Sequence, residues 1–365
     1  MKALKWIGLL IGLPSAAIAL FYVWASAAAQ DPQANAQIVS YAPASGSSDG
    51  EIASPEQGYT LVSYNIGYLS GLANNTTERL EKSFYDENLK RAITAIQSVN
   101  PDIVALQEID FGAKRSYEVN QAEAIAQTTK LYSGAIAINW NKNYVPFPYW
   151  PPAAHFGKML SGQAILTRSL FPITDNRRFV LAQVADKPFF YNAFYLDRLA
   201  QVTQINLPAP STQANSSTQA DPSTQSIIII NVHLEAFSEQ TRVDQTRFVR
   251  ELAEDYAQSY PVIVVGDFNS SLNRPSFVAA TGETYQETQF SIKEMLSSKQ
   301  LAPAPAQSNW NSQPTFPSDN PTYKLDYCFY TPSTIEVLET SVISAAGESS
   351  DHWPISIRFR FKDKT

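Results

Sequence analysis

The sequence predicts a layered α/β fold, because β-branched runs typical of strands alternate with amphipathic segments typical of helices. Residues 60–65 and 102–108 are apolar runs that end in polar side chains, and residues 78–99 between them carry apolar side chains at helical spacing. This succession is typical of sheets covered by helices. With 365 residues and 44% hydrophobic composition, the chain is long enough for one large domain or two small ones.

The first 29 residues predict export of the protein. Lys2 and Lys5 precede an apolar run from Trp6 to about Trp24, and small residues follow at 25–29. A run of about 19 apolar residues is long for a signal peptide and can span a bilayer, so residues 1–29 are either a signal peptide or an N-terminal membrane anchor. The two lysines would remain cytoplasmic. We therefore expect a secreted or membrane-anchored protein whose folded part lies outside the cytoplasm.

The rest of the chain divides into a linker and a domain. Residues 30–58 are rich in Ser, Ala, Pro, Gln and Gly, which predicts a flexible linker before a domain at 59–365. Residues 204–225 repeat Ser-Thr-Gln and predict a low-complexity surface insertion. Further helices are expected at 119–131, 239–259 and 292–298, and further strands at 161–168, 189–205, 226–233, 324–330, 335–342 and 355–361.

Polar residues suited to chemistry stand where the predicted strands end. Residues 262–265 form a β-branched run, Gly266 allows a sharp turn, and Asp267 and Asn269 follow. Carboxylate and amide oxygens suit Mg²⁺, and a histidine oriented by a carboxylate can act as a general base. Taken singly, each residue also fits a turn, a helix cap or a buried histidine. The further members of the set are Asn65, Glu108, His233, Asp326, Asp351 and His352.

Seven segments resemble, in order, the motifs of the endonuclease/exonuclease/phosphatase superfamily. They are VSYNIGYLSG, DIVALQEID, SGQAILTR, NVHLEAF, VIVVGDFNSS, KLDYCFY and SSDHWPISIRF. The resemblance covers Tyr59 to about Phe361 and implies a four-layer sandwich of two packed mixed β-sheets flanked by helices. Tyr64 departs from the family pattern, which often has Trp before the asparagine, and the insertion at 204–225 is unusual for the family.

The resemblance also implies a metal site. Glu108 matches the principal Mg²⁺ ligand of the family, and Mn²⁺ is a possible substitute. Asn65 matches the amide that helps to position metal and phosphate. Asp351 matches a second acidic contact near the metal.

The remaining motif residues match catalytic and substrate-binding groups. Asp267 and Asn269 match the pair that holds the attacking water and contacts the phosphate, and His233 matches a histidine that contacts the scissile phosphate. Asp326 matches the acid that orients the last histidine, His352. Family members are described with the counterpart of either His352 or Asp267 as the base, so the sequence leaves the base open.

These observations favour a Mg²⁺-dependent phosphoesterase that hydrolyses a phosphodiester or phosphomonoester by in-line attack of water. An envelope nuclease cleaving DNA or RNA is the alternative within this class, and an inactive binding module on the same fold is an alternative of another class. The net charge of −7 gives no global basic field for nucleic acid, which favours a lipid or small phosphoester as substrate. The membrane is the expected partner of the N-terminal segment, and no protein partner is evident. The single cysteine, Cys328, excludes an internal disulfide.

Overall fold

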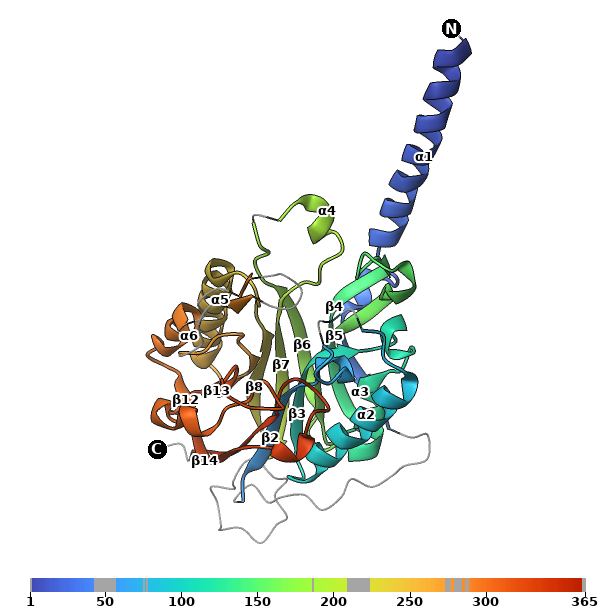
Figure 1. The fold of residues 1–365 in the computed structure, drawn as a ribbon. Coiled ribbons are helices and arrows are strands. Elements are labelled where there is room, and N and C mark those ends of the chain that lie inside the picture. The colour runs from blue at the N-terminus through green and yellow to red at the C-terminus, as the bar shows by residue number, and fades with distance from the viewer. Residues whose placement is uncertain are drawn as a thin grey trace, which may run out of the picture.

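The protein folds into two β-sheets packed face to face, with helices on both outer faces (Figure 1). The computed structural model describes residues 2–42, 57–74, 76, 78–185, 187–208, 224–272, 277–278, 284–285 and 289–362. The side chains of residues 2–11 are not part of this description. This architecture confirms the predicted four-layer sandwich of two mixed sheets.

The first sheet has seven strands. In order across the sheet they are β1 (Ala36–Ser40), β4 (Ser133–Val145), β5 (Gly157–Thr167), β3 (Ile103–Asp110), β2 (Tyr59–Asn65), β15 (Ile355–Phe361) and β14 (Ile335–Val342). Strands β2 and β3 are parallel, and the other neighbours are antiparallel. The parallel pair requires a crossover, which α2 (Lys82–Gln97) provides on the outer face.

The second sheet has six strands. In order they are β12 (Ala302–Ala304), β13 (Asp326–Tyr330), β9 (Val262–Asp267), β8 (Thr224–His233), β7 (Leu199–Pro208) and β6 (Ile173–Val180). Strands β8 and β9 are parallel, and α5 (Glu239–Ala257) connects them. Two short strands, β10 (Phe277–Val278) and β11 (Thr284–Tyr285), pair with each other outside both sheets.

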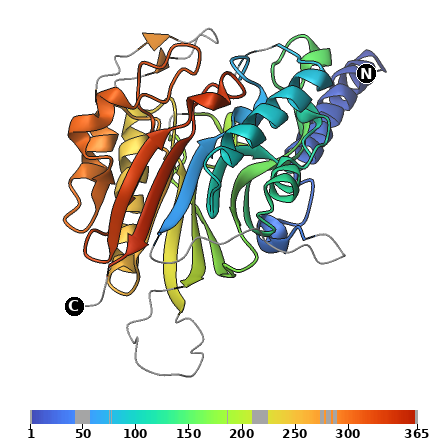
Figure 2. The same ribbon diagram turned by 90° about the horizontal axis from the view of Figure 1, so that it is seen from below.

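Helices cover the outer face of each sheet (Figure 2). Helices α2 and α3 (Gln121–Thr129) pack on the seven-stranded sheet, and α5 and α6 (Gln289–Leu296) pack on the six-stranded sheet. Six short 3₁₀ turns are η1 (Pro32–Asn35), η2 (Gly67–Leu69), η3 (Lys114–Ser116), η4 (Pro152–Ala154), η5 (Gln307–Ser312) and η6 (Ser344–Ala346).

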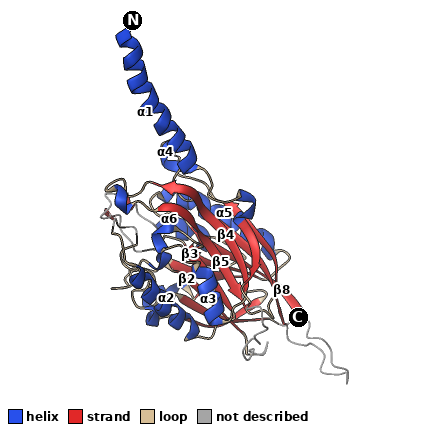
Figure 3. Ribbon diagram, turned by 90° about the vertical axis from the view of Figure 1, so that its right-hand side faces the viewer, coloured by secondary structure: helices blue, strands red, loops and turns tan. Residues whose placement is uncertain are grey.

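Two further helices lie at one end of the sandwich. Helix α1 (Lys2–Ser26) projects away from the body, and the short α4 (Phe189–Asn192) lies near its base (Figures 1 and 3). Among the residues whose side chains the structure describes, which leave out residues 2–11 of α1, no helix is long and apolar enough to cross a membrane.

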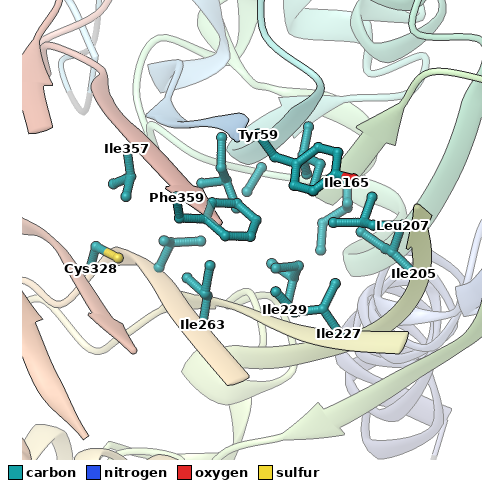
Figure 4. Packing of buried hydrophobic residues seen from close by; sticks show 14 of the residues in the cluster. Tyr59, Ile165, Ile205, Leu207, Ile227, Ile229, Ile263, Cys328, Ile357 and Phe359 are labelled. Carbon is teal, nitrogen blue, oxygen red and sulfur yellow. The ribbon is translucent and has the colours of Figure 1, made fainter. Parts of the chain in front are cut away.

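The layer between the sheets changes from apolar to polar along the strands. Alternate residues of a strand face the same side, so one column of each strand faces the opposite sheet. At one end these columns are apolar, as Figure 4 shows for Tyr59, Ile227, Ile229 and Ile263. Further along the same columns come Ser63, Gln107 and Asn231, and the last positions are Asn65, His233 and Asp267.

The expectation of a flexible linker at 30–58 is wrong for its first part. Strand β1 lies within it and pairs antiparallel with β4, from Ala36 opposite Ala137 to Ser40 opposite Ser133. The side chain of Asn141 accepts hydrogen bonds from the backbone N–H groups of Ala29 and Gln30. Composition did not reveal this because the partner strand β4 was itself not predicted. Residues 43–56 lie outside the described residues.

The expected strand at 189–205 and the insertion at 204–225 also need correction. Residues 189–192 are helical, and β7 begins only at Leu199. Strand β7 continues to Pro208, which pairs with Thr224 at the start of β8, so a regular hairpin takes up both ends of the predicted insertion. Residues 209–223 lie outside the described residues. Strand β6 was not predicted either.

Candidate active site

All eight residues predicted for the site lie at the polar end of the sandwich. They come from strands of both sheets and from the segments that follow or precede them. Asn65 ends β2, Glu108 lies in β3, His233 ends β8, Asp267 ends β9, Asn269 follows β9, Asp326 opens β13, and Asp351 with His352 precedes β15. The two sheets meet directly here, because the side chain of Asn65 donates a hydrogen bond of 3.0 Å to Asp267.

Unusual backbone conformations aim two of these side chains. The register of β3 against β5 shifts between Leu106 and Ile109, and Glu108 within this bulge has a φ of 50°. Asn269 has a φ of 48°, and its backbone N–H donates to Asp267 Oδ1 at 2.7 Å. Left-handed conformations are costly for residues other than glycine and cluster at functional sites. The bulge therefore lets Glu108 leave the regular alternation of the strand.

Gly266 is required for the close approach of β9 to β8. Its φ is 137°, and a Cβ atom there would lie 2.0 Å from the carbonyl oxygen of Val232. A larger residue would push apart the two parallel strands that end in His233 and Asp267. The expected sharp turn at Gly266 is wrong, because β9 continues through Gly266 to Asp267. The glycine instead positions the site by allowing the two strands to approach closely.

Two carboxylates converge on one amide group. The side-chain nitrogen of Asn74 donates to Glu108 Oε2 at 2.9 Å and lies 3.2 Å and 3.4 Å from the two carboxylate oxygens of Asp351. Burial, and then the negative charge of Asp351, raise the pKa of Glu108 to about 7. Two acids that face the same point, one buried and one partly buried, repel each other unless a proton or a cation lies between them. This pair therefore fits a divalent metal ion.

Asn65 is not in hydrogen-bond contact with this acidic pair. Its side-chain oxygen accepts a hydrogen bond from the backbone N–H of Gly67 at 3.1 Å, and its side-chain nitrogen donates to Asp267. Ser350 links it to Asp351, because the Ser350 hydroxyl donates to the carbonyl oxygen of Asn65 at 2.8 Å and lies 3.3 Å from Asp351 Oδ1. In this arrangement Asn65 orients Asp267.

His352 and Asp326 form a buried hydrogen-bonded pair. His352 Nδ1 lies 2.8 Å from Asp326 Oδ2, and His352 Nε2 lies 3.7 Å from Asp267 Oδ2. Burial lowers the pKa of His352, but the negative charges of Asp326 and Asp267 outweigh it and raise the pKa to about 10. The three residues bring possible ligand atoms within 4.8 Å of one another. Because a protonated His352 already balances the acids, this group has less need of a metal than the Glu108 and Asp351 pair.

Asp267 lies at the centre of the site. Its Oδ2 atom is 3.7 Å from Nε2 of both His233 and His352. Burial raises the pKa of Asp267 to about 6, against the opposing effect of the charge on His352. At neutral pH this carboxylate is therefore mainly ionised and beside a cation.

The second histidine is held by an arginine that the sequence analysis missed. Arg198 Nη1 lies 2.6 Å from His233 Nε2, and its Nη2 donates to the hydroxyl of Tyr195 at 3.2 Å. Burial, and then the charge of Arg198, lower the pKa of His233 well below its usual value. A guanidinium only donates, so Nε2 accepts and the neutral ring carries its proton on Nδ1. His233 also lies 3.4 Å from Glu108 Oε1.

Asn74 and Arg198 carried no sequence signal. Asn74 lies in the turn after η2, and Arg198 precedes β7, whose first residue Leu199 pairs with His233. Only the strand register places Arg198 beside the histidine. Together the residues offer a place for a cation, a neutral histidine backed by a guanidinium, and a carboxylate beside a second histidine.

Comparison with known proteins identifies the class of protein. Residues 62–352 match the model of the endonuclease/exonuclease/phosphatase family, and the chain belongs to this family. The sequence resemblance is therefore confirmed. The fold is that of this family, whose members hydrolyse phosphoesters. No curated protein matches the sequence.

Solved structures share the fold at low sequence identity. The human Nocturnin catalytic domain with bound sulfate is 15% identical, with a TM-score of 0.53 over 92% of this chain and 100% of that chain. A mannosyl-6-phosphatase of Bacteroides thetaiotaomicron is 16% identical, with a TM-score of 0.53 over 83% of this chain and 100% of that chain. A humanized Danio rerio TDP2 is 14% identical, with a TM-score of 0.51 over 83% of this chain and 99% of that chain.

Proposed function

We propose that the protein is a Mg²⁺-dependent phosphoesterase that hydrolyses a phosphodiester or phosphomonoester by in-line attack of water. The convergence of Glu108 and Asp351 on one amide nitrogen supports it most directly. These carboxylates would hold Mg²⁺ or Mn²⁺ in place of the contact with Asn74. A cation bound there would neutralise negative charge on the phosphoryl oxygens.

His233 and Arg198 supply the phosphate contact in this proposal. The pKa of His233 lies well below its usual value, so the ring is neutral at physiological pH. To donate to the phosphate it would carry its single proton on Nε2, the atom that faces Glu108 and Asp267, once Arg198 turns to the phosphate. Arg198 brings a permanent positive charge and is buried except for 6% of its surface. Both groups suit the charge that develops on a phosphoryl oxygen as water attacks.

The protonation states favour Asp267 as the base. At neutral pH Asp267 is mainly ionised and His352, with a pKa of about 10, is protonated. Asp267 would take the proton of the attacking water while the new bond from water oxygen to phosphorus forms and the ester bond breaks. His352, held by Asp326, would stabilise the negative charge next to it. Asn269 would help to orient the water.

The location and the substrate class belong to the same proposal. Export follows from the basic residues before the apolar N-terminal run, which would act as a membrane anchor. Without residues 1–29 the net charge is −9, because the removed part holds Lys2 and Lys5 and no acid, so the exported part disfavours long polyphosphate chains. A lipid or small phosphoester is therefore preferred, with an envelope nuclease as the second candidate. An inactive binding module would leave the buried acids without a use.

A panel of substrates tests the proposal. The full-length protein in mild detergent, with Mg²⁺, is given bis(p-nitrophenyl) phosphate, p-nitrophenyl phosphate, phospholipid vesicles, duplex DNA and RNA at equal phosphate. Hydrolysis of a nitrophenyl ester or of vesicles that is lost in Glu108→Gln supports the proposal. Cleavage of DNA or RNA with untouched vesicles would favour the nuclease. No hydrolysis of any substrate, with tight phosphate-ester binding, would favour the inactive module.

A further inference from the structure

The exposed apolar side chains of this protein are concentrated at one end. Of the 17 large hydrophobic side chains that are exposed among the described residues, ten belong to three segments. Helix α1 carries six, the loop between β4 and β5 carries Tyr149 and Trp150, and helix α4 carries Phe189 and Phe190. Trp150 and Phe189 are 79% and 77% exposed, which is costly in water without a partner.

Helix α1 contacts α4 and the end of β4 from which the β4–β5 loop starts. The ring of Tyr22 on α1 lies 6.3 Å from that of Phe189 and 5.4 Å from that of Phe194. On its other side, Phe21 and Trp24 contact Tyr144 at the end of β4, at 5.7 Å and 6.3 Å. Helix α1 therefore links the two sides of this end of the molecule, where Figures 1 and 3 show α1 and α4. The exposed apolar residues of α1, the β4–β5 loop and α4 are here called the aromatic collar.

The base of α1 is fixed to the domain by hydrogen bonds and burial. The side-chain nitrogen of Asn143 donates to the carbonyl oxygen of Trp24 at 3.1 Å. The backbone N–H of Asn143 donates to the carbonyl oxygen of Ala27 at 2.9 Å. Lys142 Nζ donates to the carbonyl oxygen of Ser26 at 3.1 Å, and Ala25 is fully buried. Because the helix base is part of the fold, the orientation of the domain follows that of the helix.

The chemistry of the aromatic collar matches a lipid surface. The stretch from Trp6 to Trp24 contains no charged residue, and residues 143–157 contain no Asp, Glu, Lys or Arg. A helix of 25 residues is about 37 Å long at 1.5 Å per residue. Tryptophan and tyrosine concentrate where membranes meet water, and lysines flank such regions. Lys142 and Lys158 flank the β4–β5 loop, and Lys187 precedes α4.

We propose that the aromatic collar docks on a lipid bilayer, with α1 inserted into the acyl chains and Tyr149, Trp150, Phe189 and Phe190 in the headgroup region. This inference rests on the proposed function only for its membrane location. It requires that residues 1–29 stay on the protein, as their contacts with β4 indicate. It replaces the free tether expected from the composition of 30–58 with a fixed orientation.

The docked orientation brings the active site to the lipid surface. The segment that carries Phe189 and Phe190 continues to Tyr195 and Arg198. Arg198 contacts His233 directly, and Tyr195 contacts Arg198. On the other side, the β4–β5 loop is tied to the loop of Asn74 by a hydrogen bond of 2.7 Å from Arg79 to the carbonyl oxygen of Ala153. Both loops of the collar therefore border the site. The substrate class that fits is a phosphoester held at the membrane surface.

Fluorescent labels at single cysteines test the docking. Tyr149→Cys, Phe189→Cys and the control Leu170→Cys are made in the full-length protein and labelled with a nitrobenzoxadiazole dye. The native Cys328 is buried and does not compete. Leu170 is 52% exposed but follows the opposite end of β5. The proteins are reconstituted with vesicles of phosphatidylcholine and phosphatidylglycerol, with and without a spin-labelled lipid that quenches the dye.

We expect the labels at 149 and 189 to shift to the blue and to lose emission with the quencher lipid, while the label at 170 does neither. If the protein floats with the vesicles but both collar labels stay in water, α1 acts alone and the docking is wrong. If the protein does not float, the lipid partner is wrong. If the labels are shielded without lipid and the protein is oligomeric, the collar binds a second copy and the proposal fails.

A second readout separates the docking from the chemistry. The double variant Trp150→Ser with Phe190→Ser should lower hydrolysis of a vesicle-bound phosphoester about tenfold and leave that of bis(p-nitrophenyl) phosphate unchanged, because it removes apolar contact with lipid only. Leu170→Ser is the matched control. Equal loss on both substrates would contradict the docking. Absent hydrolysis with collar labels in lipid would overturn the proposed function and leave the docking intact.

Discussion

The two ends of the layer between the sheets differ in chemistry although the same strands build both. At one end Ile227 and Ile229 of β8 lie with Tyr59 and Leu61 of β2 in one fully buried apolar cluster. At the other end the same strands present His233 and Asn65. A few residues along each strand thus separate the part that stabilises the fold from the part that holds buried charge.

A layer of amides lies between these two ends. Gln107 Nε2 donates to Asn231 Oδ1 at 2.6 Å, and Asn231 Nδ2 donates to the carbonyl oxygen of Leu106 at 3.0 Å. Gln163 and Gln201 on neighbouring strands join the network. Burying hydrogen-bonded amides costs less free energy than burying charges, so the layer makes a gradual transition from the apolar core to the ionised site. The apolar end should therefore control stability, and the polar end activity.

The largest effect should come from Asp267→Asn. Loss of the proposed base should reduce kcat about 10³-fold, within the range of about 10²–10⁴ for a general base. The melting temperature should stay the same or rise, because a buried carboxylate with a raised pKa is removed. Steady-state kinetics measures kcat, and thermal unfolding measures the melting temperature. Asp102→Asn is the control, since this buried acid pairs with Arg168 at the apolar end, and its loss should lower stability without changing kcat.

The converse change is Ile229→Ala in the apolar end. It should lower the free energy of unfolding by about 2–4 kcal/mol, because it leaves a cavity in a fully buried cluster. Activity per folded molecule should stay close to that of the unaltered protein. Denaturant unfolding with active-site titration provides the measurement. A fall in kcat as large as that of Asp267→Asn would show that the two ends are not separable.

Coupling within the polar end gives a smaller effect. Asp326→Ala and His352→Ala should each reduce kcat on the order of 10²-fold, and the double variant should be little worse than the poorer single one, because the two side chains act as one hydrogen-bonded pair. A double-mutant cycle measures this. Losses that multiply would contradict a shared role.

The smallest effect is the pH dependence of stability in EDTA. The pKa of Glu108 is about 7 in the fold against an ordinary value of 4.5, and that of His352 is about 10 against 6.5. Between these ordinary values and the raised ones the folded protein holds more protons than the unfolded chain. Stability therefore falls as pH rises through about 4.5–7 for Glu108 and about 6.5–10 for His352.

Mg²⁺ should oppose this loss, because it binds the ionised carboxylates. At a concentration of about 100 times its Kd it adds about 2.7 kcal/mol, or roughly 5–10 °C, and the gain should be larger near pH 8 than near pH 5. Thermal unfolding with and without Mg²⁺ at the two pH values measures it. An equal gain at both would argue against Glu108 as a ligand.

The position of the candidate site residues at strand ends could be predicted because the strands are recognisable in the sequence. Val262 to Val265 form a buried run, and Asp267 and Asn269 stand at the end of this strand and just after it. The strands at 335–342 and 355–361 were predicted with the observed bounds. The end of a strand can be predicted from the local sequence, and the topology of the sheets then brings these ends to one edge.

Features that depend on distant pairing could not be predicted. Arg198 reaches His233 only through the register of β7 against β8, and Glu108 is aimed by a bulge that depends on β5. Strand β1 exists because β4 offers it an edge. Each of these results from long-range contacts, which composition and periodicity do not contain.

Metal dependence is the most direct test of the account. The full-length protein is assayed with bis(p-nitrophenyl) phosphate in EDTA and after addition of Mg²⁺, and Mg²⁺ binding is measured by calorimetry for the unaltered protein and for Glu108→Gln. We expect no turnover in EDTA, recovery with Mg²⁺, and Mg²⁺ binding weakened by at least about tenfold in the variant. Full activity in EDTA, or equal Mg²⁺ affinity in both proteins, would contradict the metal site at Glu108 and Asp351.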